Sequence, residues 1–167
     1  MRVLFLAVAV MISSCGFHLR GTQSMEASLS NIYIVSADRF GSFYQNLVRT
    51  FSQSDIAVTD SPADSEYQLT IGRERNTKRA IGTTKTISVA EYEIRLEVSI
   101  GLVSSEGEVV IPQTIVGTER TYTFDSVSLV GSNVEEALLL EEMKVDLVAQ
   151  ILRRVDASVR TYRQTHQ

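Results

Sequence analysis

The sequence lacks the residues on which several kinds of protein chemistry depend. Among 167 residues there are one cysteine, two histidines, two prolines and no tryptophan. A single cysteine excludes a disulfide framework. His18 and His166 stand at opposite ends of the chain, so neither fits a catalytic triad or a metal cluster. Because phosphate-binding loops, glycine fingerprints and nucleophile elbows are also missing, the sequence predicts a non-enzyme with no catalytic residues, no metal and no cofactor.

An excess of basic charge is also missing. The chain has 16 Lys and Arg against 20 Asp and Glu, a net charge of −4. This acidic balance argues against nucleic acid as a partner. Neither an internal repeat nor a low-complexity tract divides the sequence.

The N-terminus has the pattern of a lipoprotein export signal. Arg2 precedes an apolar run from Val3 to Ile12, which is shorter than the roughly 20 residues that span a bilayer. Ile12-Ser13-Ser14-Cys15 then has the order of a lipobox, an aliphatic residue and two small ones before cysteine. We therefore predict a signal peptide at 1–14 and a mature protein that is lipid-anchored through acylated Cys15. By resemblance to lipoproteins generally, Gly16 favours the outer membrane, with the protein on its periplasmic side.

Without its signal the protein is one small acidic domain. Removing 14 of 167 residues leaves 153, and because Arg2 is the signal's charged residue, 15 basic residues remain against 20 acidic ones. That length suits a single core. We assign 15–30 to an acylated tether and 31–163 to the folded domain.

The first half of the domain has the pattern of a strand, a helix and a strand. The run 32–35 is apolar, as in a buried strand, and Tyr67, Leu69 and Ile71 alternate with polar residues. A turn-rich connection covers 54–65. Strand, helix, strand implies a right-handed parallel crossover. Between the strands, one helical face is formed by Phe40, Phe43, Tyr44, Leu47, Val48 and Phe51.

The second half predicts a hairpin followed by a long helix. Apolar residues alternate with mostly charged ones from Tyr92 to Leu102, as in a strand covered on one side, and a turn at 104–107 leads to a return strand from Val109 to about Phe124. Ser132-Asn133-Val134-Glu135 fits a capping box for a helix that reaches about Tyr162. Its predicted core stripe is Val134, Leu138, Val145, Val148, Leu152, Val155 and Val159.

These elements give an α+β fold in the order β-α-β-β-β-α. We expect a two-layer sandwich in which two helices pack on one face of a mixed four-stranded sheet. The other face is left to solvent or to a partner.

One basic segment stands out in this acidic chain. Residues 73–85 carry five cations and one anion between the second and third predicted strands. Two interpretations remain open, an ordinary solvated hairpin or a site for an anionic ligand. Phosphate groups would suit the second, since each contact with a cation is charge-assisted.

Several segments resemble the LptE family of LPS-assembly lipoproteins. The most specific is Cys15-Gly16-Phe17-His18-Leu19-Arg20-Gly21, whose register the acylated cysteine fixes. The others are Ala90-Glu91-Tyr92, Glu119-Arg120-Thr121-Tyr122, Glu142-Met143 with Asp146, and 150–154, which reads QILRR. Together they cover nearly the whole mature chain.

The resemblance implies a function that composition does not show. Members of this family plug the lumen of the outer-membrane β-barrel LptD, assist its assembly and bind lipopolysaccharide during its insertion into the outer leaflet. The resemblance also implies that a basic residue shortly before Ala90-Glu91-Tyr92 binds lipopolysaccharide phosphates. In this sequence that residue is Lys85. Lys78 and Arg79 are further candidates by their charge alone. In the family we would expect another cation in the loop before the last helix, but 125–133 contains none, so Arg120 is the remaining candidate. Some members carry a longer polar tail, whereas this sequence stops shortly after its predicted last helix, so we expect no role that depends on such a tail.

Three other functions compete with this one. The first is a general outer-membrane lipoprotein scaffold of another envelope-assembly machine, which a different partner would reveal. A carrier of soluble ligands or lipids would need a closed apolar pocket. An enzyme would need a catalytic constellation that the sequence does not offer.

Overall fold

The computed structural model describes residues 29–83, 89–125 and 129–166. The predicted signal peptide, Cys15, most of the tether and Lys85 lie outside these ranges. Leu29, which the sequence placed at the end of the tether, is fully buried in the core.

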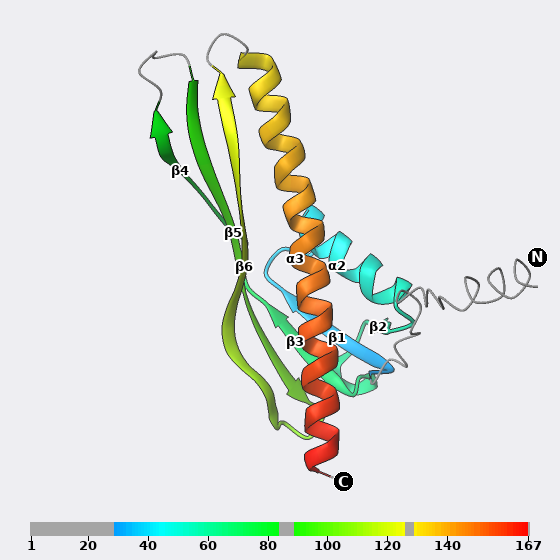
Figure 1. Ribbon diagram of the computed structural model, residues 1–167. Helices are drawn as coiled ribbons and strands as arrows, with labels where there is room; N and C mark the ends of the chain where they lie inside the picture. The colour runs from blue at the N-terminus through cyan, green and yellow to red at the C-terminus, as the bar shows by residue number, and fades with distance from the viewer. Residues whose placement is uncertain (1–28, 84–88, 126–128, 167) are drawn as a thin grey trace, which may run out of the picture.

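Two helices, one short 3-10 helix and six strands form the described structure (Figure 1). The sheet has the order β2-β1-β3-β5, and β4 and β6 also pair with β5. Since 90–97 of β5 pair with both β4 and β6, these two strands lie on opposite edges of β5. The elements are β1 (Asn31–Ser36), α2 (Ser42–Gln53), β2 (Ala57–Thr59), η1 (Pro62–Asp64), β3 (Tyr67–Ile71), β4 (Arg75–Thr83), β5 (Val89–Ser104), β6 (Val109–Asp125) and α3 (Leu129–Thr165).

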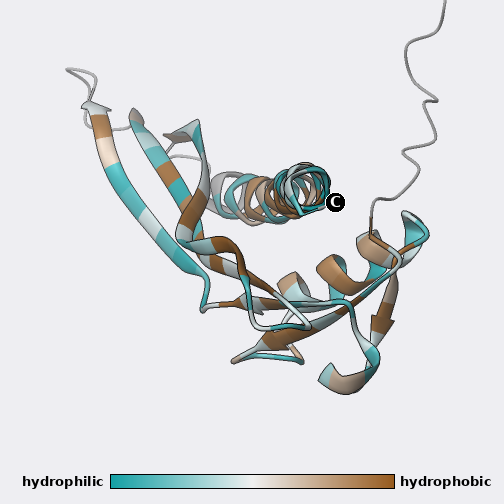
Figure 2. Ribbon diagram, turned by 90° about the horizontal axis from the view of Figure 1, so that it is seen from below, coloured by the Kyte–Doolittle hydropathy of each residue, from teal (hydrophilic) through white to brown (hydrophobic). Residues whose placement is uncertain are grey.

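The α+β class and its layers are confirmed. Both helices lie on the concave side of a curved mixed sheet (Figure 2). The predicted count of four strands is wrong, because β2 and β4 also join the sheet. β2 has three residues, and β4 carries charged residues on both faces, so neither shows the apolar alternation that marks a half-buried strand.

The predicted parallel pairing of the first two strands is confirmed. β1 and β3 are parallel, and α2 joins β1 to the edge strand β2 before the chain returns to β3. Phe43, Leu47 and Phe51 of α2 are buried as predicted. Phe40 is not on this face but is 95% exposed. The Asp38 carboxylate accepts hydrogen bonds from the N–H groups of Phe40 and Gly41, so a turn precedes the helix, which begins at Ser42.

The long hairpin follows its predicted alternation. One face of β5 is buried beneath the helices. β6 returns antiparallel along nearly the whole of β5, with bulges near Ile100 and Leu102. The buried residues of β5 are Ile94, Leu96, Val98, Ile100 and Leu102.

The capping box is not where the sequence placed it. α3 begins at Leu129, so Ser132 lies within its first turn rather than at the N-cap. A local capping motif indicates the start of a helix only weakly. Once a helix is nucleated, each added residue gains a backbone hydrogen bond, so the helix can extend past the motif towards the N-terminus.

The core stripe of α3 was predicted correctly in its second half and wrongly in its first. Val134, Leu138 and Val145 are 64%, 60% and 58% exposed. A four-residue step turns the contact line by about 40°, since an α-helix turns about 100° per residue. The row of α3 residues that contact the sheet therefore winds around the helix as the sheet twists. The predicted stripe, with steps of three and four residues, runs straight along the helix and so departs from the contacting row in the first half. The residues that follow the contacting row are Met143, Leu147, Ile151, Val155 and Val159, all fully buried.

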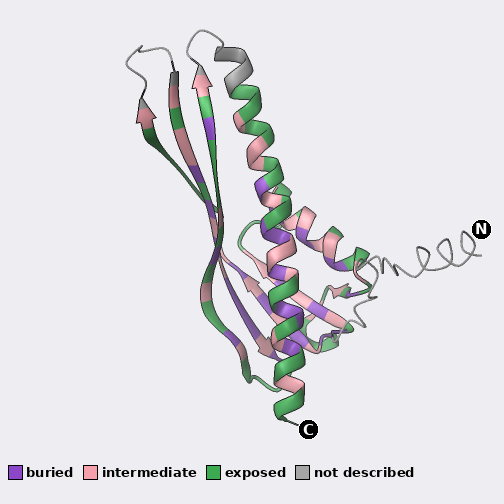
Figure 3. Cartoon of the chain, in the orientation of Figure 1, coloured by how far each residue is buried: buried purple, intermediate pink, exposed green. Residues whose placement is uncertain are grey.

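The molecule divides into a body and an arm. The arm contains β4 and the parts of β5 and β6 that lie beside it in the sheet, which are 89–97 and 117–125. It also contains the first half of α3 (129–146). The body holds the remaining elements. Buried residues are concentrated in the body, while the arm is mostly intermediate or exposed where it is described (Figure 3).

Candidate ligand-binding site on the arm

The register of the arm places its cations on two faces. Lys78 of β4 lies opposite Ile94 of β5, and Ile94 lies opposite Arg120 of β6. Residues opposite one another in antiparallel strands point to the same side of the sheet. Lys78 and Arg120 therefore share the inner face with buried Ile94, beneath α3, while Arg79 lies on the outer face opposite Glu93.

Lys78 is held between aromatic rings and a carboxylate of α3. Its Nζ lies 4.4 Å, 5.2 Å and 5.6 Å from the ring centroids of Tyr92, Tyr122 and Phe124. The same atom donates to Oε2 of Glu136 at 2.6 Å, and the Tyr122 hydroxyl donates to that oxygen at 2.5 Å. Ring faces attract cations, so four groups hold this ammonium. We call these five residues the Lys78 clasp.

The contacts within the clasp shift the pKa values of its members. Burial lowers the pKa of Lys78, but the bonds to Glu136 and Tyr122 raise it, so the net pKa lies above the ordinary 10.5. The hydrogen bonds from Lys78 and Tyr122 lower the pKa of Glu136 below 4.5. Burial, followed by the bond to Glu136, raises the pKa of Tyr122. The clasp is therefore a charged pair with a neutral phenol at physiological pH.

Arg120 makes the second link between the arm strands and α3. Its Nη2 donates to Oδ2 of Asp146 at 2.6 Å. Both side chains are about half exposed, so this ion pair contributes little to stability.

The outer face of the arm carries pairs of opposite charge between strands. Arg79 donates two hydrogen bonds to the Glu93 carboxylate, from Nε at 2.7 Å and from Nη2 at 3.1 Å. These hydrogen bonds lower the pKa of the Glu93 carboxyl. Arg95 donates to Glu119 at 2.9 Å. Thr77, Arg79, Glu93 and Arg95 line a shallow depression of about 200 Å³.

The structure does not gather the predicted site residues into one cluster. Lys78 and Arg120 share the inner face, Arg79 points to the opposite face, and Lys85 lies outside the described residues. Each of the three described cations already has a carboxylate partner. The sequence alone did not reveal these partners, which are Glu136, Glu93 and Asp146, or the aromatic rings around Lys78. Recognising 75–83 as a strand would have shown that Lys78 and Arg79 face opposite ways.

A larger cavity lies where the arm meets the body. It has a volume of about 440 Å³ at the carboxyl ends of β1 and β3, beside the start of α2. Its lining is mixed, with Asp38, Tyr44, Arg73 and Glu74 among apolar and backbone groups. Burial raises the pKa of Glu74, and nearby Lys144 opposes the rise. These contacts do not single out one class of ligand.

Neither a metal site nor a membrane-spanning helix is found among the described residues. Within the described ranges, no group of three or more His, Cys, Asp and Glu side chains could hold a metal ion. No described helix combines the length and apolar character needed to cross a membrane.

The fold matches solved structures of small bacterial lipoproteins. One is the crystal structure of rare lipoprotein B from Shewanella oneidensis, with a TM-score of 0.71 and 19% identity over 80% of this chain and 98% of that one. The solution structure of lipoprotein B from Nitrosomonas europaea matches with a TM-score of 0.68 and 25% identity, covering 85% of this chain and 91% of that one.

The family follows from the sequence match. The family model described as LptE, Lipopolysaccharide-assembly, matches residues 29–155, which cover all the strands, α2 and most of α3. The chain therefore belongs to the LptE family. The protein named LPS-assembly lipoprotein LptE in Pectobacterium atrosepticum is 25% identical over 91% of this chain and 83% of its own length. The protein of that name in Photorhabdus laumondii is 23% identical over the same shares.

Proposed function

We propose that this protein is an outer-membrane lipoprotein of lipopolysaccharide assembly that plugs an LptD-type β-barrel, assists its assembly and binds lipopolysaccharide. The observation that carries the proposal is the family match over residues 29–155, which includes the whole sheet. The relatives' name, LPS-assembly lipoprotein LptE, supplies the process. No covalent chemistry is part of this role.

The proposed anchor is Cys15, with the protein on the periplasmic side of the membrane. Fourteen residues, 15–28, precede the first described one, Leu29. Two lipid signals suffice for stable anchoring, so a diacylglyceryl group with an amide-linked chain would hold the protein at the membrane. Mass spectrometry of the mature protein should show an acylated N-terminal Cys15. A Cys15→Ala variant should keep its signal peptide and lack the lipid mass.

The surface of the domain suits a place inside a barrel. The lumen of a large outer-membrane barrel is polar. The outer face of the arm is polar as well, with the pairs Arg79–Glu93 and Arg95–Glu119 exposed on it. Exposed Val134, Leu138 and Val145 add apolar contact area on the side of α3 that faces away from the sheet.

The proposed ligand contacts are Lys85, Lys78, Arg79 and Arg120 with lipopolysaccharide phosphates. Contacts between cations and phosphate are charge-assisted and short. Lys78 and Arg120 lie in one row of the inner face, about 10 Å apart, because strands are spaced by about 4.8 Å. A ligand with more than one phosphate could engage both.

Affinity purification of the full-length lipoprotein from its own outer membrane tests the partner. A large β-barrel recovered at about one to one supports the proposal. A second outer-membrane lipoprotein carrying the same tag serves as the control and should not recover that barrel. Recovery of the protein alone, or with another envelope-assembly machine, would contradict the translocon role and leave the lipid anchor standing.

A further inference from the structure

The cations on the inner face of the arm meet two carboxylates of one helix. Lys78 contacts Glu136 and Arg120 contacts Asp146, both at 2.6 Å. The carboxylates are ten residues apart, which corresponds to about 15 Å along a helix. α3 thus lays an acidic segment over the row that contains Lys78 and Arg120.

The oxygen of Glu136 occupies a place that suits a phosphate oxygen. Oε2 accepts from the Lys78 ammonium at 2.6 Å and from the Tyr122 hydroxyl at 2.5 Å. An anionic ligand oxygen at this point would find the same two donors and the same charge. Carboxylate and phosphate accept hydrogen bonds of the same kind, so the two compete for one place.

The part of α3 that carries these carboxylates is less deeply buried than the part that follows, although Leu139 and Leu140 pack partly against the core. Among its described side chains before Leu147, Met143 is the buried one, whereas Leu147, Val148, Ile151, Val155 and Val159 are all buried further on. Local opening costs least where few apolar groups are buried. The first half of α3 can therefore move from the arm while the second half stays in the core.

We propose that Glu136 and Asp146 occupy, in the free protein, the positions that anionic oxygens of lipopolysaccharide take when it binds, so that the first half of α3 is an internal competitor for the arm. This inference rests on the proposed function, because it assumes that the arm binds lipopolysaccharide. The carboxylates protect the cations from weaker anions, and binding requires that α3 release them.

The competition predicts that removing these carboxylates strengthens binding. The apparent affinity of a site falls in proportion to the fraction of protein in which the site is free. A Glu136→Gln, Asp146→Asn variant of the full-length protein should bind purified lipopolysaccharide more tightly than wild type, by roughly five-fold or more if α3 covers the site most of the time.

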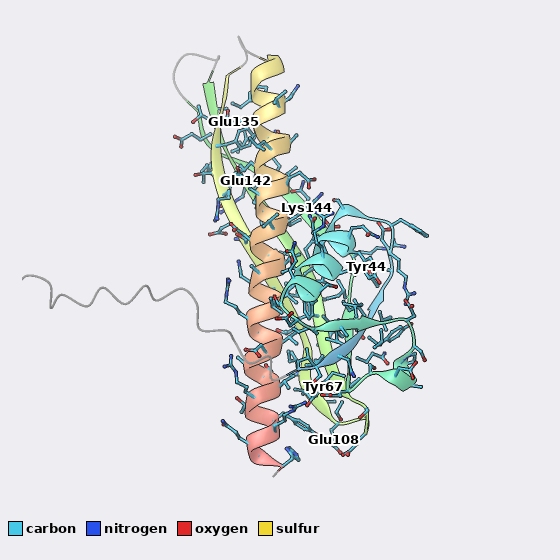
Figure 4. All side chains as sticks on the ribbon, turned by 90° about the vertical axis from the view of Figure 1, so that its right-hand side faces the viewer. Tyr44, Tyr67, Glu108, Glu135, Glu142 and Lys144 are labelled. Carbon is cyan, nitrogen blue, oxygen red and sulfur yellow. The ribbon has the colours of Figure 1, made fainter. Side chains whose placement is uncertain are left out.

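A matched control separates competition from net charge. Glu135 and Glu142 are exposed neighbours on the same half of α3 (Figure 4), and neither makes an ion pair within the described structure. A Glu135→Gln, Glu142→Gln variant makes the same change of charge, so any gain from weaker repulsion of the ligand appears in both variants. Asp146→Asn alone provides a second comparison with Glu142→Gln, because the Arg120–Asp146 pair is half exposed and its loss leaves the fold intact.

Equilibrium titration of the detergent-solubilised lipoproteins with purified lipopolysaccharide is the test. Tighter binding by the Glu136→Gln, Asp146→Asn variant than by its control supports the inference. If wild type binds and the two double variants bind equally, the inference is overturned while the proposed function stands. If neither wild type nor either variant binds, the ligand part of the proposed function fails and the inference fails with it.

Discussion

The two halves of α3 contact the same sheet by different means. From Leu147 to Val159 the helix buries five apolar residues in the core of the body. Between Asn133 and Asp146 it buries Met143, packs partly buried Leu139 and Leu140 against the core, and makes its charged contacts with the sheet through the Lys78 clasp and the Arg120–Asp146 pair. Apolar burial contributes most to folding stability, whereas polar contacts can be exchanged for those of another molecule. The difference assigns stability to the body, and the arm is where we propose that binding occurs.

The largest effect should come from the buried half of α3. Ile151→Ala removes a fully buried side chain and should lower the free energy of unfolding by about 2–5 kcal/mol. Val145→Ala, on the exposed side of the same helix, should change it by about 0.5 kcal/mol or less. Urea unfolding of the two variants measures both values. Similar losses would remove the contrast between the two sides of α3.

A smaller effect should come from the clasp. Lys78→Met removes the charge from three ring faces and from Glu136, and should cost about 1 kcal/mol, since Lys78 is 34% exposed and Glu136 23%. Hydrogen exchange should quicken in the first half of α3 and stay unchanged after Leu147. Arg79→Met, on the other face of the same strand, is the control and should leave exchange in α3 unchanged. Equal quickening along the whole helix would show that the halves do not open separately.

The clasp should also depend on pH. The pKa of Glu136 lies below its ordinary 4.5 in the folded state, so its contribution is full above that value and is lost as pH falls through the folded pKa. The pKa of Lys78 lies above 10.5, so the upper limit is reached as pH rises past that value. The difference in unfolding free energy between wild type and Glu136→Gln should be constant from about pH 6 to 9 and shrink in acid. A difference that persists undiminished at pH 3, in urea unfolding, would contradict this account of the pair.

The smallest effect should come from the outer face of the arm. The Arg95–Glu119 pair has side chains that are 47% and 60% exposed. Arg95→Gln should therefore change the free energy of unfolding by less than about 0.5 kcal/mol. A loss as large as that of Lys78→Met, measured in the same urea series, would show that both faces of the arm contribute equally.

The sequence predicted the elements with clear periodicity. The alternation of β5 and the apolar face of α2 are local patterns, and both were confirmed apart from Phe40. β4 could not be recognised this way, because Lys78 and Arg79 put charge on both of its faces. The exposure of Val134 depends on the twist of a sheet formed by distant segments, which helical periodicity does not encode.

The candidate site was predicted in its charges but not in its geometry. Lys78, Arg79 and Arg120 could be selected from the sequence because they are cations in an acidic chain. No local pattern shows that Lys78 contacts Glu136, which lies 58 residues later in the sequence. Such a pairing follows from tertiary structure. Lys85 and Cys15 stay predictions, because both lie outside the described residues.

Hydrogen exchange of the full-length lipoprotein, with and without purified lipopolysaccharide, tests the division between body and arm most directly. The account predicts slow exchange from Leu147 to Val159 and faster exchange in the first half of α3. It also predicts that lipopolysaccharide alters exchange in β4 and that first half and leaves the body unchanged. Uniform protection along α3, or a response to lipopolysaccharide confined to the body, would contradict the account.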